Sequence, residues 1–474
     1  MASQSATDQL PKGAFSNSMF LIVGAVPVML DTTIINIAIN HLTAVFNTNL
    51  ATVQWAVTAY VLALGIAVPF AGWLLHRVNG KTLFQAAMIA FLLGSLLSGL
   101  SWNAGALIVF RILQGLASGV IMPTLSTLAV RIAGGSQNLG KLMSLVSIPV
   151  VFAPIVGPVV GGLILQYWSW HWLFFINLPI GAIGFILMQV KFPSFPADDT
   201  TAQLDWAGAL LLAITSGTLI YGVTQVINAD SRTVGIVCLC VGALALVAYV
   251  SSAFRLKAKA TIPLAMFRSK NFSAAFVSLF LAGFATNGPM LLLPMLFQNV
   301  RHLSVIMAAL WLVPQGIGML ITRPLIGKWT DKYGARIVVL PAILVTMIGT
   351  IPFVFFNSTT ASWLVWLVLL IRGMGVGGFT VPVMADCYVG VEKLLVPAAS
   401  VGTRMIQNIG SAFGSAVLAT VVTATLTRHP LDLTGAYHAS FITSLIFMVI
   451  GVFPALFLTN KLHQAQPALS GHNR

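Results

Sequence analysis

Asp31 is an acid in the middle of a long apolar run, residues 17–40. If that run crosses a bilayer, an ionised carboxylate there is costly and should face a polar cavity or a cationic partner. A carboxyl group in such a place can bind and release protons as its surroundings change. We therefore expect Asp31 to couple proton movement to a change in the protein, with a helix cap or hydrogen-bond anchor as the alternative.

The composition of the whole chain supports a membrane setting for this acid. The 474 residues are 58% hydrophobic and 7% charged, whereas soluble domains carry about a quarter charged residues. The net charge of +14 does not indicate a nucleic-acid partner, because Lys and Arg fall singly in short gaps between apolar runs. The three cysteines (Cys238, Cys240 and Cys387) form neither a disulfide pattern nor a metal site. No metal and no cofactor is expected.

Apolar segments long enough to cross a hydrocarbon core, about 20 residues each, occur fourteen times by our reading of the sequence. The predicted spans are 17–40, 52–75, 82–101, 104–130, 141–166, 171–192, 206–227, 233–253, 271–297, 304–326, 336–356, 362–386, 395–425 and 436–459. The gaps between them leave no room for a soluble domain, so the sequence predicts an all-α, multi-pass membrane protein.

The distribution of basic residues predicts the orientation of these spans. Lys and Arg concentrate in cytoplasmic loops of membrane proteins. With a cytoplasmic N-terminus, the outer loops hold only Arg232, Arg301 and Arg428, and most of the 24 basic residues lie inside. We therefore predict a protein of the inner (cytoplasmic) membrane with both termini in the cytoplasm.

An internal duplication is visible in the sequence. Three features recur in the same order at nearly one offset: the loop 72–81 as 327–336, Arg111 as Arg372, and the pair Gly157 and Gly161 as Gly410 and Gly414. The offset spans eight helices, so both copies cross the membrane in the same direction, and parallel repeats hold substrate between them near mid-bilayer. The expected organisation is a six-helix half (1–195), two inserted linker helices (196–265), and a second six-helix half with a cytoplasmic tail (266–474).

Four motifs resemble one known family over essentially the whole chain. They are Leu30-Asp31-Thr32-Thr33, the loop Gly72–Lys81, Arg111-Ile-Leu-Gln114-Gly115, and Ala153-x-x-x-Gly157-Pro158-x-x-Gly161. The sequence resembles the fourteen-helix drug:proton antiporter branch of the major facilitator superfamily. The resemblance implies the fold of two parallel six-helix repeats, and the last motif is the family's signature of export.

The resemblance also implies a partner for Asp31. In this superfamily the first and fourth helices both line the central cavity, which would bring Arg111 close to Asp31. Protonation of Asp31 would then release Arg111 and bias the cavity between its two openings. A static ion pair that only holds the helices together is the alternative.

Gating is expected at two places. The resemblance assigns the outward seal to Gly157, Pro158 and Gly161, and the cytoplasmic latch to the two loops that carry Gly72, His76, Arg77, Asp331 and Arg336. The first loop departs from the family pattern, because His76 stands where the family has an acid. This departure argues against an ordinary charge relay in the first half. His76 could titrate near neutral pH, and a solvated histidine with no role in gating is the alternative.

Residues expected to line the substrate cavity are Asn36, Gln114, Phe284, Asn287, Met290, Gln315, Arg404 and Gln407. Relatives that export cationic drugs carry additional acids in the second half, and this set has none. The cavity could therefore suit neutral, zwitterionic or anionic compounds.

The sequence as a whole predicts a proton-coupled antiporter that exports small amphipathic compounds by alternating access. A dedicated exporter of one metabolite is the main alternative, and a passive pore is a weaker one.

An enzyme is not expected, because the eight histidines are scattered and no His-Glu-x-x-His pattern occurs. Gly80-Lys81-Thr82 lacks the first glycine of a phosphate-binding loop, so no nucleotide partner is expected. The expected partners are a small molecule, protons and the lipid bilayer.

Overall fold

The computed structural model describes residues 13–48, 50–133, 139–146, 148–197, 201, 203–226 and 231–460. Within these residues the regular structure is helical. The first half contains α1 (Ala14–Ile34), α2 (Ile39–Val45), α3 (Leu50–Arg77), α4 (Gly80–Gly99), α5 (Ala104–Ala133), α6 (Leu139–Val146), α7 (Ile148–Tyr167), α8 (Trp172–Phe175) and α9 (Asn177–Lys191). The linker contains α10 (Trp206–Gln225) and α11 (Arg232–Leu256). The second half contains α12 (Lys270–Asn299), α13 (Val305–Trp311), α14 (Val313–Tyr333), α15 (Ala335–Ile348), α16 (Ser362–Asp386), α17 (Val396–Arg428) and α18 (Leu433–Ala455).

Thirteen of the predicted spans coincide with helices that are long and apolar enough to cross a membrane. The remaining span, 141–166, falls on α6 and α7, which are separated by residue 147, outside the described residues. The predicted multi-pass, all-helical fold is therefore confirmed. Some crossings are interrupted: the first passes through a 3-10 turn at Ile35–Ala38 before continuing as α2.

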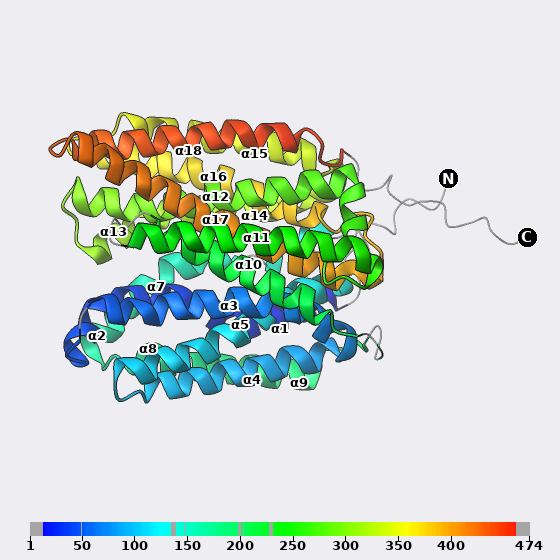
Figure 1. Ribbon diagram of the computed structural model, residues 1–474. Helices are drawn as coiled ribbons and strands as arrows, with labels where there is room; N and C mark the ends of the chain where they lie inside the picture. The colour runs from blue at the N-terminus through cyan, green and yellow to red at the C-terminus, as the bar shows by residue number, and fades with distance from the viewer. Residues whose placement is uncertain are drawn as a thin grey trace, which may run out of the picture.

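The long helices lie side by side along a common direction (Figure 1). Helices α1 to α9 form one group and α12 to α18 another, and α10 contacts α3 of the first group and α17 of the second. Helix α11 packs on α10 and turns an apolar face outward, with residues such as Leu244, Val247 and Phe254 exposed. The arrangement is that of two six-helix bundles joined by a helix pair.

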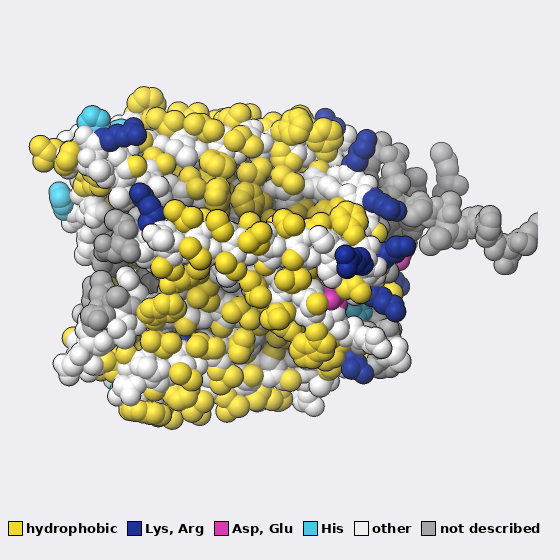
Figure 2. Space-filling model, in the orientation of Figure 1, with side chains coloured by type: hydrophobic (Ala, Val, Ile, Leu, Met, Phe, Trp, Pro, Cys, Tyr) yellow, Lys and Arg dark blue, Asp and Glu magenta, His cyan; other side chains and the backbone are white. Residues whose placement is uncertain are grey.

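The surface divides into zones as expected of a membrane protein. Hydrophobic side chains cover the middle of the visible face, and most Lys and Arg side chains gather at one end (Figure 2). This end, which we call the basic end, includes Arg77 at the end of α3, and Arg255 and Lys259 around the end of α11. A charge-free apolar belt between polar ends matches the hydrocarbon core of a bilayer.

Close helix contacts through glycine occur in equivalent places in the two bundles. A Cβ atom on Gly115 of α5 would lie 2.3 Å from the carbonyl oxygen of Tyr60 in α3. A Cβ on Gly373 of α16 would lie 2.0 Å from the carbonyl oxygen of Gln315 in α14. The two backbones can approach this closely only because glycine has no side chain.

A second pair of glycine contacts also recurs. Gly157 of α7 packs on Thr33 of α1, where a Cβ would lie 2.1 Å from Oγ1. Gly410 of α17 packs on Phe280 of α12, where a Cβ would lie 2.2 Å from the carbonyl oxygen. The recurring sequence features therefore correspond to recurring contacts between helices.

Candidate functional site

Asp31 lies fully buried in α1 and forms an ion pair with Arg111 of α5, which is also fully buried. The carboxylate oxygen Oδ2 accepts from Nη1 of the guanidinium. The two residues are far apart in sequence and meet because α1 and α5 pack against each other in the first bundle. The juxtaposition expected from the family resemblance is present.

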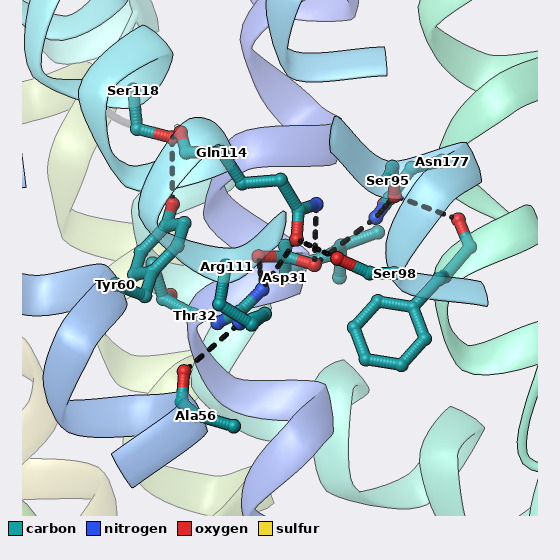
Figure 3. Close-up of polar contacts among 12 residues, drawn as sticks. Asp31, Thr32, Ala56, Tyr60, Ser95, Ser98, Arg111, Gln114, Ser118 and Asn177 are labelled. Carbon is teal, nitrogen blue, oxygen red and sulfur yellow. Dashed lines mark hydrogen bonds and ion pairs between the residues drawn. The ribbon is translucent and has the colours of Figure 1, made fainter. Parts of the chain in front are cut away.

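Neutral polar side chains surround the acid on its other side (Figure 3). The other carboxylate oxygen, Oδ1, accepts from Nδ2 of Asn177 at 3.2 Å and from Nε2 of Gln114 at 3.4 Å. Ser98 donates to Oε1 of Gln114 at 3.1 Å, and Asn177 donates to Ser95 at 2.9 Å. Asp31 therefore sits in a polar network that draws on α1, α4, α5 and α9.

Arg111 is held by more than its acid. Its Nε donates to the carbonyl oxygen of Ala56 at 3.1 Å, and its Nη1 donates to Oε1 of Gln114 at 3.0 Å. The guanidinium carbon lies 4.2 Å from the centre of the Tyr60 ring, a cation–π contact. These contacts would still hold Arg111 if Asp31 lost its charge.

The pair can act as a protonation-dependent contact. A charge-assisted hydrogen bond between guanidinium and carboxylate is about twice as strong as a neutral one, and protonation of Asp31 would remove its charge. Thr33, two residues after Asp31, packs against Gly157 of α7, so a movement of α1 would change its packing on α7. What the arrangement offers chemically is one proton-binding carboxylate linked to helix packing.

The equivalent position in the second bundle has no acid. Arg372 of α16 is fully buried, and its Nη1 donates to Oε1 of Gln315 at 2.8 Å. Its Nη2 donates to the carbonyl oxygen of Ala285 at 3.3 Å. Both partners are neutral, so the positive charge of this arginine is not offset by them.

Several of the expected cavity residues lie inside one bundle or the other. Gln114 belongs to the Asp31 network, and Gln315 binds Arg372. Phe284 is fully buried and stacks on Phe447 with 4.0 Å between ring centres. Met290 is half-buried in α12.

Two other expected cavity residues lie at the seam between the bundles. Arg404 of α17 donates from Nη2 to Ser126 of α5 at 3.3 Å and from Nη1 to Gln407 at 3.4 Å. The side chains of Asn36, Asn287 and Pro158 lie outside what the structure describes. The substrate role of the cavity residues and the gating role of Pro158 stay predictions.

A contact between the two bundles closes the basic end. Asp331, near the end of α14, accepts from the backbone N–H of Gly140 at 2.7 Å and of Lys141 at 2.9 Å. These N–H groups begin α6 in the other bundle, so Asp331 caps a helix across the interface. Ser144 of α6 donates to the carbonyl oxygen of Arg323, and the backbone N–H of Arg336 donates to the carbonyl oxygen of Thr459 at 3.0 Å.

The matching place in the first bundle is built differently. Gly72 of α3 faces Val401 of α17, where a Cβ would lie 3.1 Å from the valine side chain. His76 and the start of α17 line a cavity of about 940 Å³ at the basic end, with Arg255 and Asp205 on its walls. The guanidinium of Arg77 lies over the ring of Trp73, at 5.6 Å. Gly161, which is predicted to belong to the outward seal, packs on Ile34 and Ile37.

Sequence reasoning missed part of the site and misplaced one acid. Ser95, Ser98 and Asn177 were not expected as partners of the Asp31 network, although two serines three residues apart in an apolar helix are a usable signal. The place of Asp386 at the end of the predicted span 362–386 indicates a hydrated acid, and this prediction is wrong, because Asp386 is fully buried at the end of α16. It accepts from the backbone N–H of Thr459 at 3.2 Å and from that residue's hydroxyl.

The comparison with known proteins identifies the family. The family model of the Major Facilitator Superfamily matches residues 21–415. The chain therefore belongs to this superfamily, whose members are membrane transporters of small molecules.

Its relatives include named resistance proteins. The chain is 29% identical over 427 residues to "Multidrug resistance protein B homolog" of Mycobacterium tuberculosis, covering 89% of this chain and 78% of the relative. It is 26% identical over 452 residues to "Lincomycin resistance protein LmrB" of Bacillus subtilis, covering 91% and 92%. Among solved structures, the proton:xylose symporter XylE matches its fold with a TM-score of 0.66 at 15% identity, over 95% of this chain and 98% of that one.

Proposed function

We propose that this transporter is a proton-coupled antiporter that exports small amphipathic compounds from the bacterial cytoplasm. The observation that carries the proposal is the fully buried ion pair between Asp31 and Arg111. A carboxylate in a membrane interior is a functional candidate by default, because it is expensive to keep there. The names of the relatives favour drug-like compounds as substrates.

The proposed cycle uses the ion pair as a switch. With Asp31 ionised, the ion pair holds Arg111 of α5 against α1. When Asp31 takes a proton from the outside, its attraction to Arg111 is lost, and α1 can change its packing on Gly157 of α7. The cavity then opens toward the cytoplasm, the proton leaves inward, and substrate binding restores the outward-opening form.

The orientation is part of the proposal. We place the basic end in the cytoplasm, since Lys and Arg favour that side. The contact of Asp331 with the start of α6 would then be the inner latch. Breaking and remaking it would accompany each change of access.

The test is proton flux in proteoliposomes with an inward-directed proton gradient and a pH dye inside. Vesicles that contain the wild-type protein and are preloaded with the neutral fluorophore dansylamide should take up protons as the compound leaves. Asp31→Asn should abolish this flux because the amide cannot bind a proton at that position. Asp386→Asn is the matched control, since that acid is equally buried but lies away from the ion pair.

Two results would contradict the proposal. Compound movement without proton flux in the wild-type protein would remove the coupling. Proton flux in Asp31→Asn equal to that of the wild type would make Asp31 a structural residue.

A further inference from the structure

Midway along its helices, the second bundle carries arginines but no acid among the described residues. Its acids are Asp331, Asp386, Glu392 and Asp432, and each lies at or beyond the end of a helix. Asp331 caps α6, Asp386 binds Thr459, and Asp432 accepts from the N–H of Gly435 at 2.8 Å. Arg372 and Arg404, by contrast, lie well inside α16 and α17.

Arg404 is the one of these two arginines that a ligand could reach. Arg372 is fully buried within its own bundle, whereas Arg404 is partly exposed. Arg404 faces α5 of the other bundle, because its Nη2 donates to Ser126. One turn nearer the basic end, Ser400 accepts from Thr127 at 2.9 Å and closes the seam. Arg404 therefore lies one helical turn farther from the basic end than the hydrogen bond that joins the two bundles at Ser400 and Thr127.

The guanidinium of Arg404 has few and long hydrogen bonds for its number of donors. Its two contacts, to Ser126 and Gln407, are 3.3 and 3.4 Å long and go to neutral oxygens. Its Nε is buried and donates to none of the described residues. A guanidinium has five N–H donors in a fork that matches a carboxylate. Arg111, in the other bundle, meets its carboxylate, a carbonyl oxygen and an aromatic face.

We propose that the exported compounds are amphipathic organic anions, and that Arg404 binds their carboxylate or sulfonate group at the seam. This inference rests on the proposed function, since it names the substrate class of the same transport pathway. An anion would bring a negative charge to this place and form a charge-assisted hydrogen bond with the guanidinium. A cation placed beside Arg404 would be repelled.

The test uses three probes that share one fluorophore: dansylglycine is an anion, dansylamide is neutral, and dansylcadaverine is a cation. Binding to the purified full-length protein in detergent is followed by dansyl fluorescence. Dansylglycine should bind at least tenfold more tightly than dansylcadaverine. Arg404→Gln should weaken dansylglycine about 10- to 100-fold, as expected for a lost charged hydrogen bond, and leave dansylamide within about twofold.

Two variants act as controls. Arg404→Lys keeps the charge without the fork and should lose less affinity for dansylglycine than Arg404→Gln does. Arg428→Gln removes a charge from the exposed end of the same helix and should change none of the three affinities. Unchanged dansylamide binding in Arg404→Gln also shows that the variant is folded.

Three results would overturn the inference. The first is dansylcadaverine binding as tightly as dansylglycine, and the second is no binding of any probe. The third is an equal loss for all three probes in Arg404→Gln, which would make Arg404 a structural contact. If dansylamide drives Asp31-dependent proton flux but dansylglycine neither binds nor moves, the antiport proposal stands and only the anion inference fails. If dansylglycine binds through Arg404 without Asp31-dependent flux, the antiport proposal alone fails.

Discussion

The two bundles treat an equivalent buried arginine in opposite ways. Arg111 faces the carboxylate of Asp31, and Arg372 faces the amide of Gln315. The helix packing around them is similar, with glycine against a neighbouring backbone in each case. The close glycine contacts recur in both bundles, but the acid beside the arginine is present only in the first. The helix packing therefore does not depend on whether the buried arginine has a negatively charged partner. The buried arginine of the first bundle is therefore paired with a carboxylate, and that of the second bundle has only neutral partners.

The largest difference in stability between the two sites is expected when one partner of the ion pair is removed. Asp31→Asn or Arg111→Met leaves a buried charge uncompensated, which typically costs about 3–5 kcal/mol of stability. Arg372→Met removes a charge from neutral partners and should cost much less. Thermal unfolding midpoints of the purified variants measure the difference.

The double variant Asp31→Asn with Arg111→Met provides the control for this prediction. It removes both charges together, so it should be more stable than the Arg111→Met single variant. Equal destabilisation by Arg111→Met and Arg372→Met would show that the two sites do not differ electrostatically.

Gln315→Glu should make the second bundle resemble the first. Oε1 of Gln315 already lies 2.8 Å from Nη1 of Arg372, so a carboxylate there would form a charged hydrogen bond with little rearrangement. We expect a gain of about 1–3 kcal/mol in stability, seen as a higher unfolding midpoint. Gln315→Met, similar in volume but without an acceptor, should lower the midpoint instead. If the glutamate variant is no more stable than the methionine variant, Arg372 does not need a counter-charge.

The two loops predicted to act as latches at the basic end provide the smallest contrast. Asp331→Ala removes a helix cap worth about 0.5–2 kcal/mol, so the amides of α6 should exchange with deuterium faster. His76→Asp places an acid near the start of α17, where the helix dipole favours it by about 0.3–1 kcal/mol. Exchange at residues 396–401 should then slow. Asp432→Ala, which uncaps α18 at the other end, is the control and should leave exchange in α6 unchanged.

Most of the fold could be predicted from local features of the sequence. Apolar runs of membrane-spanning length, basic residues at their ends and the repeated glycines are each readable without knowledge of the partner helix. The pairing of Asp31 with Arg111 came from the family resemblance, because no local feature says which distant helix faces an acid.

What sequence reasoning missed depends on how each helix is rotated. Ser95 and Asn177 join the Asp31 network because α4 and α9 turn those faces toward α1. Asp386 stands at a helix end, where an acid is usually hydrated, but the chain returns over it and Thr459 binds it. Such burial is decided by tertiary contacts, which residue type and spacing do not specify.

The single carboxylate of the ion-pair site also implies a ceiling on how far this transporter could concentrate a compound. If Asp31 carries one proton per cycle, a proton-motive force of about 150 mV supplies about 3.5 kcal/mol. For a neutral compound that corresponds to an outside-to-inside ratio of roughly 300. A monovalent anion leaving the cell would also move with the membrane potential and could exceed this ratio. A second proton-carrying acid opposite Arg372 would raise the limiting concentration ratio of a neutral compound to its square, and every cycle would then use two protons.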